Sequence, residues 1–132
     1  MQITAKVESR FHTQHTQVQT NDLAKSIPIP VKPTGYGSAI NGGELLMLAL
    51  ATCFCNDIYR EAGKRNIAVS AVAVECSSEF GADGEPGRNI QYTARVSADA
   101  STEVIEELIR ATDQVAEIHN TLRRGVNVQL VQ

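Results

Sequence analysis

The sequence lacks any apolar run close to the ~18 residues that a membrane-spanning helix needs. Its N-terminus, MQITAKVESR, lacks the apolar core of a signal peptide. There is also no excess of positive charge, because the formal net charge is −3. This net charge gives no reason to expect a polyanionic partner. We therefore expect a cytoplasmic protein with no membrane partner and no nucleic-acid partner.

Cysteine is scarce, and the three residues show no spacing typical of a disulfide framework. In a reducing compartment all three are expected to be free thiols. Cys53 and Cys55 are spaced closely enough to suggest a metal-binding pair, but two residues along a helix turn the chain by about 200°. The two thiols would then point to opposite sides. We expect neither a shared metal nor a disulfide between them, and no cofactor.

The chain of 132 residues, 42% of them apolar, predicts one domain over residues 1–132. At its start, apolar residues alternate with polar ones over 3–7, which predicts a strand. A turn is expected at Ser9-Arg10, and then a mostly polar second strand over 13–20. The segment 26–37 contains three prolines, so it is expected to be extended and not helical.

A helix of about twenty residues follows, with Asn41 as its N-cap and Glu44 in its first turn. Its first half has no polar face, and an all-apolar helix is buried on every side. Because so short a chain has little other material to cover it, either the sheet wraps the helix or a second subunit does; we favour a homodimer. The helix end carries a short basic cluster, which the helix dipole explains: Arg60, Lys64 and Arg65.

The second half of the chain predicts a strand over 67–80, a turn over 81–88 and a partner strand over 90–96. Ser101 then offers an N-cap for a second helix that runs to about residue 118. A last short strand is expected over 126–130. The order β-β-α-β-β-α-β is an α+β pattern.

Several stretches of this sequence resemble the OsmC/Ohr family: Glu44-Leu45-Leu46 at the helix start, Cys53-Phe54 two to three turns on, IAVSAVAVE over 67–75, and NTLRRGVNVQL over 120–130. The resemblance covers most of the chain from about residue 35. It implies the OsmC-like fold, an intertwined homodimer with its central helices buried inside, and thiol-dependent reduction of organic hydroperoxides.

The resemblance makes Cys53 the reacting sulfur, and a thiolate is the form that attacks peroxide. It also implies an arginine from the turn after the first strand, for which Arg10 is the candidate; an exposed turn residue is the alternative. An acid at the helix start would hold that arginine. In the hydroperoxide-resistance branch the acid lies ten residues before the cysteine, where this chain has Gly43. Glu44 lies one position later, about 100° around the helix.

A second departure concerns the resolving cysteine, which the family carries in a Cys-Pro pair near the end of the second helix. Alignment on Asn120-Thr121-Leu122 puts Ala116-Glu117 there. Cys55 or Cys76 could replace it only if the fold brings one of them close. His119 lies three residues beyond the missing cysteine, and it is either a base or polar partner of Cys53 or a histidine at a frayed helix end.

These observations leave two functions open. The first is a one-cysteine peroxidase in which Cys53 reduces an organic hydroperoxide and an external thiol restores it. The second is a dimer that has kept the fold but binds a small apolar ligand without turnover. A third possibility is that Cys53 is only a core residue. The losses at Gly43 and Ala116 slightly favour the second function over the first.

Overall fold

The computed structural model describes residues 1–132 as two units, Met1–Leu45 and Leu46–Gln132, and the boundary falls within helix α1 (Gly42–Lys64). The first unit contains an antiparallel three-stranded sheet in the order β1-β2-β3. β1 (Ile3–Arg10) pairs with β2 (Thr13–Thr20), and β2 pairs with β3 (Leu23–Ser26). The two strands expected from the sequence are confirmed, whereas β3 was not predicted.

The turn between β1 and β2 lies two residues later than expected. Arg10 is the last residue of β1 and pairs with Thr13, so the turn consists of Phe11 and His12. His12 adopts a positive φ of 56°, a conformation that histidine tolerates better than most residues. The predicted turn at Ser9-Arg10 is therefore wrong, and Arg10 belongs to a strand.

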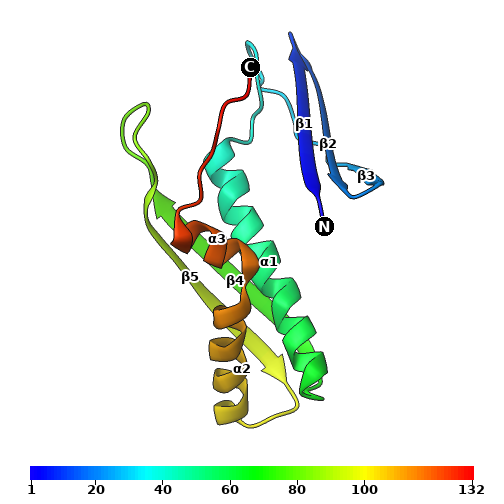
Figure 1. Ribbon diagram of the computed structural model, residues 1–132, viewed down its shortest axis with the longest axis vertical. Helices are drawn as coiled ribbons and strands as arrows, with labels where there is room; N and C mark the ends of the chain where they lie inside the picture. The colour runs from blue at the N-terminus through cyan, green and yellow to red at the C-terminus, as the bar shows by residue number, and fades with distance from the viewer. The chain divides into compact units, whose positions relative to one another are not determined.

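The second unit is built on the hairpin of β4 (Val69–Glu79) and β5 (Arg88–Ala98) (Figure 1). One face of this hairpin packs against α1 (Gly42–Lys64) and α2 (Thr102–Val115). The centre of the core is formed by five side chains that are almost fully buried: Phe54, Ile58, Ala62, Leu108 and Ala116. Partly buried residues of both strands pack around them: Val69, Val72, Val74, Tyr92, Ala94 and Val96. The predicted strands over 67–80 and 90–96 are confirmed, and so is the α+β class.

Both predicted helix starts are confirmed by their caps. The backbone N–H of Val104 donates to Ser101 Oγ over 3.2 Å. The backbone N–H of Glu44 donates to Asn41 Oδ1 over 2.8 Å. Each bond satisfies a donor that would otherwise have no partner in the first helical turn.

The second predicted helix is two helices in the structure. α2 ends at Val115, Ala116 adopts an extended conformation with ψ of 105°, and α3 (Glu117–Arg124) begins directly afterwards. Ala116 is fully buried in the core, so packing holds the break in place. The break turns the start of α3 toward α1, which positions the site described below.

The predicted final strand over 126–130 does not form. Val126, Val128 and Leu130 alternate as in a strand but are 56%, 94% and 82% exposed. A strand requires a hydrogen-bonding neighbour, and no strand of the chain pairs with this segment. No helix in the structure combines the length and apolarity needed to cross a membrane.

Helix α1 buries only one of its sides in the single chain. Leu50, Phe54, Ile58 and Ala62 recur every four residues and form the buried stripe. Leu48, by contrast, is 57% exposed and Tyr59 is 46% exposed. The expectation of burial on every side is therefore not met within one chain.

Candidate functional site around Cys53

Cys53 lies half-buried in the middle of α1, one helical turn before Asp57. Its thiol donates a hydrogen bond to Asp57 Oδ2 over 3.5 Å. Asp57 itself is only 4% exposed, although most of the helix around it is apolar. The thiol is thus attached to a buried carboxyl group and does not simply fill a gap between aliphatic side chains.

Arg60 is the cation that binds the two carboxylates next to Cys53, those of Asp57 and Glu117. Its Nη1 lies 2.8 Å from Asp57 Oδ1 and 3.2 Å from Glu117 Oε1 in the first turn of α3. Its Nε lies 3.2 Å from Glu61 Oε1. Buried carboxylates need such a partner because water no longer solvates their charge. Arg60 therefore links α1 to α3 at the site.

The rest of the basic cluster at the end of α1 also binds Glu61. Lys64 Nζ lies 2.9 Å from Glu61 Oε1, and Arg65 Nη1 lies 3.1 Å from Glu61 Oε2. The sequence explained the position of these basic residues by the helix dipole alone. In the structure each of them also forms an ion pair with a specific carboxylate. Of the cluster, Arg60 is the residue that reaches the surroundings of Cys53.

The surroundings keep Cys53 protonated at neutral pH. Partial burial raises the pKa of the thiol above its ordinary value, and the backbone N–H of Ile118 opposes this rise. The negative charge of Asp57 raises the thiol pKa further. Burial also raises the pKa of Asp57. The site thus holds a thiol and a proton acceptor, but it does not stabilise a resting thiolate.

The ligand atoms of Cys53, Asp57 and Glu117 lie within 4.8 Å of one another, so these three side chains could hold a metal ion. Arg60 already binds both carboxylates and supplies positive charge between them. A metal would have to displace this guanidinium. The arrangement present is an acid–thiol–guanidinium cluster.

Arg10 and Glu44, the other two residues expected at the site, belong to the first unit. Arg10 is exposed at the end of β1 and borders a pocket with Thr13 and His15. Glu44 Oε1 accepts a hydrogen bond of 2.9 Å from Asn41 Nδ2, so its carboxylate takes part in capping α1. The structure gives both residues a place in that unit, and their participation in chemistry at Cys53 stays a prediction.

His119 is not a histidine at a frayed helix end, because it is only 4% exposed. Its ring packs against those of Tyr92 and Phe54, with centroids 4.6 Å and 5.5 Å away. Neither ring nitrogen has a hydrogen-bond partner, so His119 does not hydrogen-bond to Cys53. Burial and the nearby Arg123 lower the pKa of His119, so the ring is neutral at pH 7.

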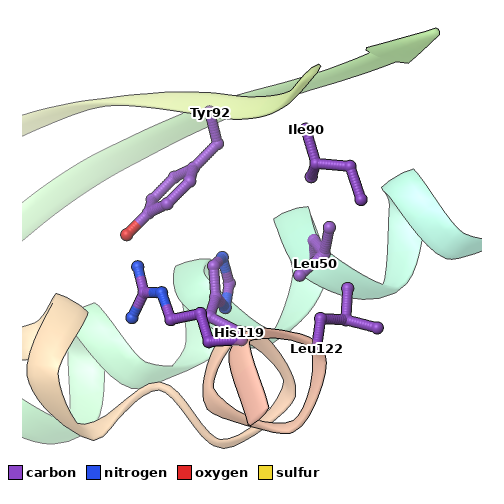
Figure 2. A pocket seen from close by; sticks show the side chains of 6 residues that line it. Leu50, Ile90, Tyr92, His119 and Leu122 are labelled. Atoms are coloured by element: carbon purple, nitrogen blue, oxygen red, sulfur yellow. The ribbon is translucent and has the colours of Figure 1, made fainter. Parts of the chain in front are cut away.

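A cavity of about 220 Å³ adjoins His119 (Figure 2). The ring of His119 rises from α3 between Tyr92 of β5 and Leu50 of α1. Leu122 and Ile90 complete the apolar part of the wall. The second unit therefore carries two features that bear on function, the polar cluster at Cys53 and this cavity.

Asp57 lies four residues after Cys53 and therefore on the same helix face, but its role and those of Arg60 and Glu117 were not predicted from the sequence. Arg60 was within reach of the same argument, because it lies three residues after Asp57 and i,i+3 neighbours share a helix face. Glu117 gave no such signal. Its position depends on the break at Ala116, which no proline or glycine marks.

Comparison with known proteins agrees with this fold. The family described as OsmC-like protein matches residues 35–131. The crystal structure of an OsmC-like protein from Mycoplasma pneumoniae superimposes with a TM-score of 0.64 at 17% identity, covering 98% of each chain. The organic hydroperoxide resistance protein OsmC of Legionella pneumophila gives 0.60 at 21% identity, covering 98% of this chain and 95% of its own.

A third solved structure, the organic hydroperoxide resistance protein OhrB of Bacillus subtilis, gives a TM-score of 0.55 at 24% identity and covers 96% of each chain. No curated protein sequence matches significantly. These likenesses at low identity establish the fold, and the family match extends over most of the sequence. This chain therefore belongs to the family of OsmC-like proteins.

Proposed function

We propose that this protein is a slow one-cysteine peroxidase that reduces organic hydroperoxides with Cys53. The single observation that carries the proposal is the hydrogen bond between the Cys53 thiol and buried Asp57, held in turn by Arg60. A thiol that served only as packing would not need an acid and a guanidinium beside it. The hydroperoxide resistance proteins that share the fold support the choice of substrate class.

The proposed reaction begins with proton transfer from the Cys53 thiol. Asp57 accepts the thiol proton, and the thiolate of Cys53 attacks the terminal oxygen of R–O–O–H. The O–O bond breaks, Cys53 becomes a sulfenic acid, and the leaving RO⁻ takes the proton to become an alcohol. An external thiol then attacks the sulfenic acid, forms a mixed disulfide and releases water. A second external thiol reduces that disulfide and restores Cys53.

The raised pKa of Cys53 explains why the reaction is expected to be slow at neutral pH, because little thiolate is present. Ala116 occupies the position at which the family carries the resolving cysteine, and we take an external thiol as the reductant. Three free cysteines and a thiol reductant favour the reducing cytoplasm as the place of action.

The test is the consumption of cumene hydroperoxide with excess dithiothreitol as reductant. We expect Cys53→Ser to lower the protein-dependent rate to background and Cys55→Ser to leave it unchanged. Cys55 is the matched control because it lies on the same helix and is also half-buried. A Cys53→Ser protein that consumes peroxide as fast as the wild type would exclude Cys53 as the reacting sulfur.

A second candidate function is the binding of a small apolar ligand without turnover. The cavity of about 220 Å³ beside Leu50 and Leu122 favours it. The two functions are separated by the peroxide assay, since a ligand-binding protein would consume no hydroperoxide in any of its cysteine variants.

We also infer that two copies of the chain cover the exposed side of α1. Leu48 and Tyr59 leave apolar surface open in the single chain, and the strand-patterned segment 126–130 has no partner. Sedimentation velocity should show a dimer for the wild type, and Leu48→Arg should shift it toward monomer because a charge would be buried in the interface. A wild type that is monomeric at micromolar concentration with full helical content would contradict this inference.

A further inference from the structure

The charges around the Cys53 thiol do not balance. The sulfur and the carboxylate oxygens of Asp57 and Glu117 lie within 4.8 Å of one another. The cation in contact with both carboxylates is Arg60. The backbone N–H of Ile118 also reaches the sulfur, but it adds a dipole and no net charge. Two negative charges therefore lie beside the thiol against one positive charge, and a molecule that approaches the sulfur enters a negative field.

The guanidinium of Arg60 is not free to hold an anionic substrate. Its Nη1 already binds Asp57 and Glu117, and its Nε lies 3.2 Å from Glu61 Oε1. A carboxylate on an incoming molecule would have to compete with three carboxylates that share this one charge. Arg60 thus holds α1 and α3 together and does not provide an anion-binding site.

Glu117 is the solvent-facing member of the cluster. Its side chain is 63% exposed, whereas that of Asp57 is 6% exposed. Hydrogen bonding to its own backbone N–H lowers the pKa of Glu117, and the charge of Arg60 adds to this effect, so the carboxylate is ionised at pH 7. In addition to burial, the charge of Glu117 raises the pKa of Cys53. The field of this carboxylate therefore reaches the sulfur.

We propose that the Cys53 site selects uncharged reaction partners against anionic ones, and that Glu117 determines this selectivity. The inference rests on the proposed function where it names the partners, which are neutral hydroperoxides and a neutral thiol reductant. A small hydroperoxide or thiol with a carboxylate close to its reacting atom is repelled. The charge preference itself is a property of the thiol and is measured without peroxide.

The test compares iodoacetamide with iodoacetate, which are nearly the same size and differ by one negative charge. Both alkylate a thiolate with loss of iodide, so the ratio of their rates does not depend on how much thiolate is present. The protein carries Cys55→Ser and Cys76→Ser, which leaves Cys53 as the reacting sulfur. In low salt we expect this ratio to be about threefold to tenfold higher for Cys53 than for the neutral free thiol 2-mercaptoethanol.

Glu117→Gln should bring the ratio to within about twofold of that of 2-mercaptoethanol, because one negative charge then faces one positive charge. Glu103→Gln is the matched control and should leave the ratio unchanged. Glu103 is an exposed glutamate in the first turn of α2, as Glu117 is in the first turn of α3. High salt should lower the ratio of the single-cysteine protein, since it screens exposed charges.

Circular dichroism first establishes that the variants are folded. A ratio equal to that of 2-mercaptoethanol would overturn the inference, and so would a ratio unchanged by Glu117→Gln or a Cys53 that reacts with neither reagent. A preference for iodoacetate would also overturn it, because a further cation would then act at the sulfur. A protein that shows the expected ratios but consumes no hydroperoxide would support the charge selectivity and contradict the proposed function alone.

Discussion

Phe54→Ala is expected to lower the free energy of unfolding by about 3–5 kcal/mol, the usual cost of removing a fully buried phenylalanine. Phe54 is 0% exposed and lies at the centre of the core. Its ring contacts those of Tyr92 and His119, so it joins α1 to both β5 and α3. The surrounding backbone belongs to three different elements and cannot collapse easily into the space left. Urea unfolding followed by circular dichroism at one fixed protein concentration measures the change.

Phe80→Ala is the matched control, because it makes the same change at a side chain that is 52% exposed. Surface substitutions of this kind usually change stability by about 0.5 kcal/mol or less. If the two variants were destabilised equally, the placement of Phe54 at the centre of the core would be wrong. Phe54→Ala should also loosen the start of α3, and with it the contact of Arg60 with Glu117.

His119→Phe is expected to raise the free energy of unfolding by about 1–2 kcal/mol at pH 7, because it removes a buried donor and acceptor that have no partner. Phenylalanine has nearly the shape of histidine and can keep the ring contacts with Phe54 and Tyr92. Thermal and urea unfolding of the two proteins measure the difference.

The pH dependence provides a second readout of the same variant. The pKa of His119 is lowered in the folded state, whereas an unfolded histidine titrates at about 6.5. The unfolded state therefore binds a proton more readily, and the wild type should lose stability as the pH falls below about 6.5 and approaches the folded-state pKa. His119→Phe should lack this part of the loss. A less stable His119→Phe protein with an unchanged profile would show that the ring nitrogens are satisfied in solution.

Much of the fold was predictable because helix caps and strand alternation depend on residues that are neighbours in the sequence. Asn41 and Ser101 cap their helices as expected, since a side-chain oxygen at an N-cap acts on the next turn alone. The alternation in β4 and β5 placed their apolar side chains on one face, as the core shows. β3 was missed because its four residues, LAKS, are all exposed and show no alternation.

The errors concern features that depend on distant parts of the chain. The break between α2 and α3 is held by the burial of Ala116, and a helix-forming alanine gives no sign of it. The segment 126–130 has the pattern of a strand, but a strand also needs a neighbouring edge. The sequence left His119 open between a partner of Cys53 and a residue at a frayed helix end for the same reason, because only the packing of α3 against α1 and β5 buries its ring.

The site, like the fold, was predictable only where it depends on residues close together in the sequence. Cys53 and Asp57 are four residues apart on one helix, and their contact follows from helix geometry. Glu44 matched a family position, yet its carboxylate bonds to Asn41 in the cap of α1. The Arg60–Glu117 pair joins residues far apart in sequence and required the structure.

The most direct test of the proposal that Cys53 is the peroxide-reactive thiol is to locate the oxidised sulfur. The reduced protein is treated with excess cumene hydroperoxide in the presence of dimedone, which traps sulfenic acids, and its peptides are analysed by mass spectrometry. The account predicts the dimedone adduct on Cys53, formed faster as the pH rises and more thiolate is present, with Cys55 and Cys76 unmodified. A folded protein whose Cys53 remains a free thiol under excess peroxide, or whose adduct lies on Cys55 or Cys76, would contradict it.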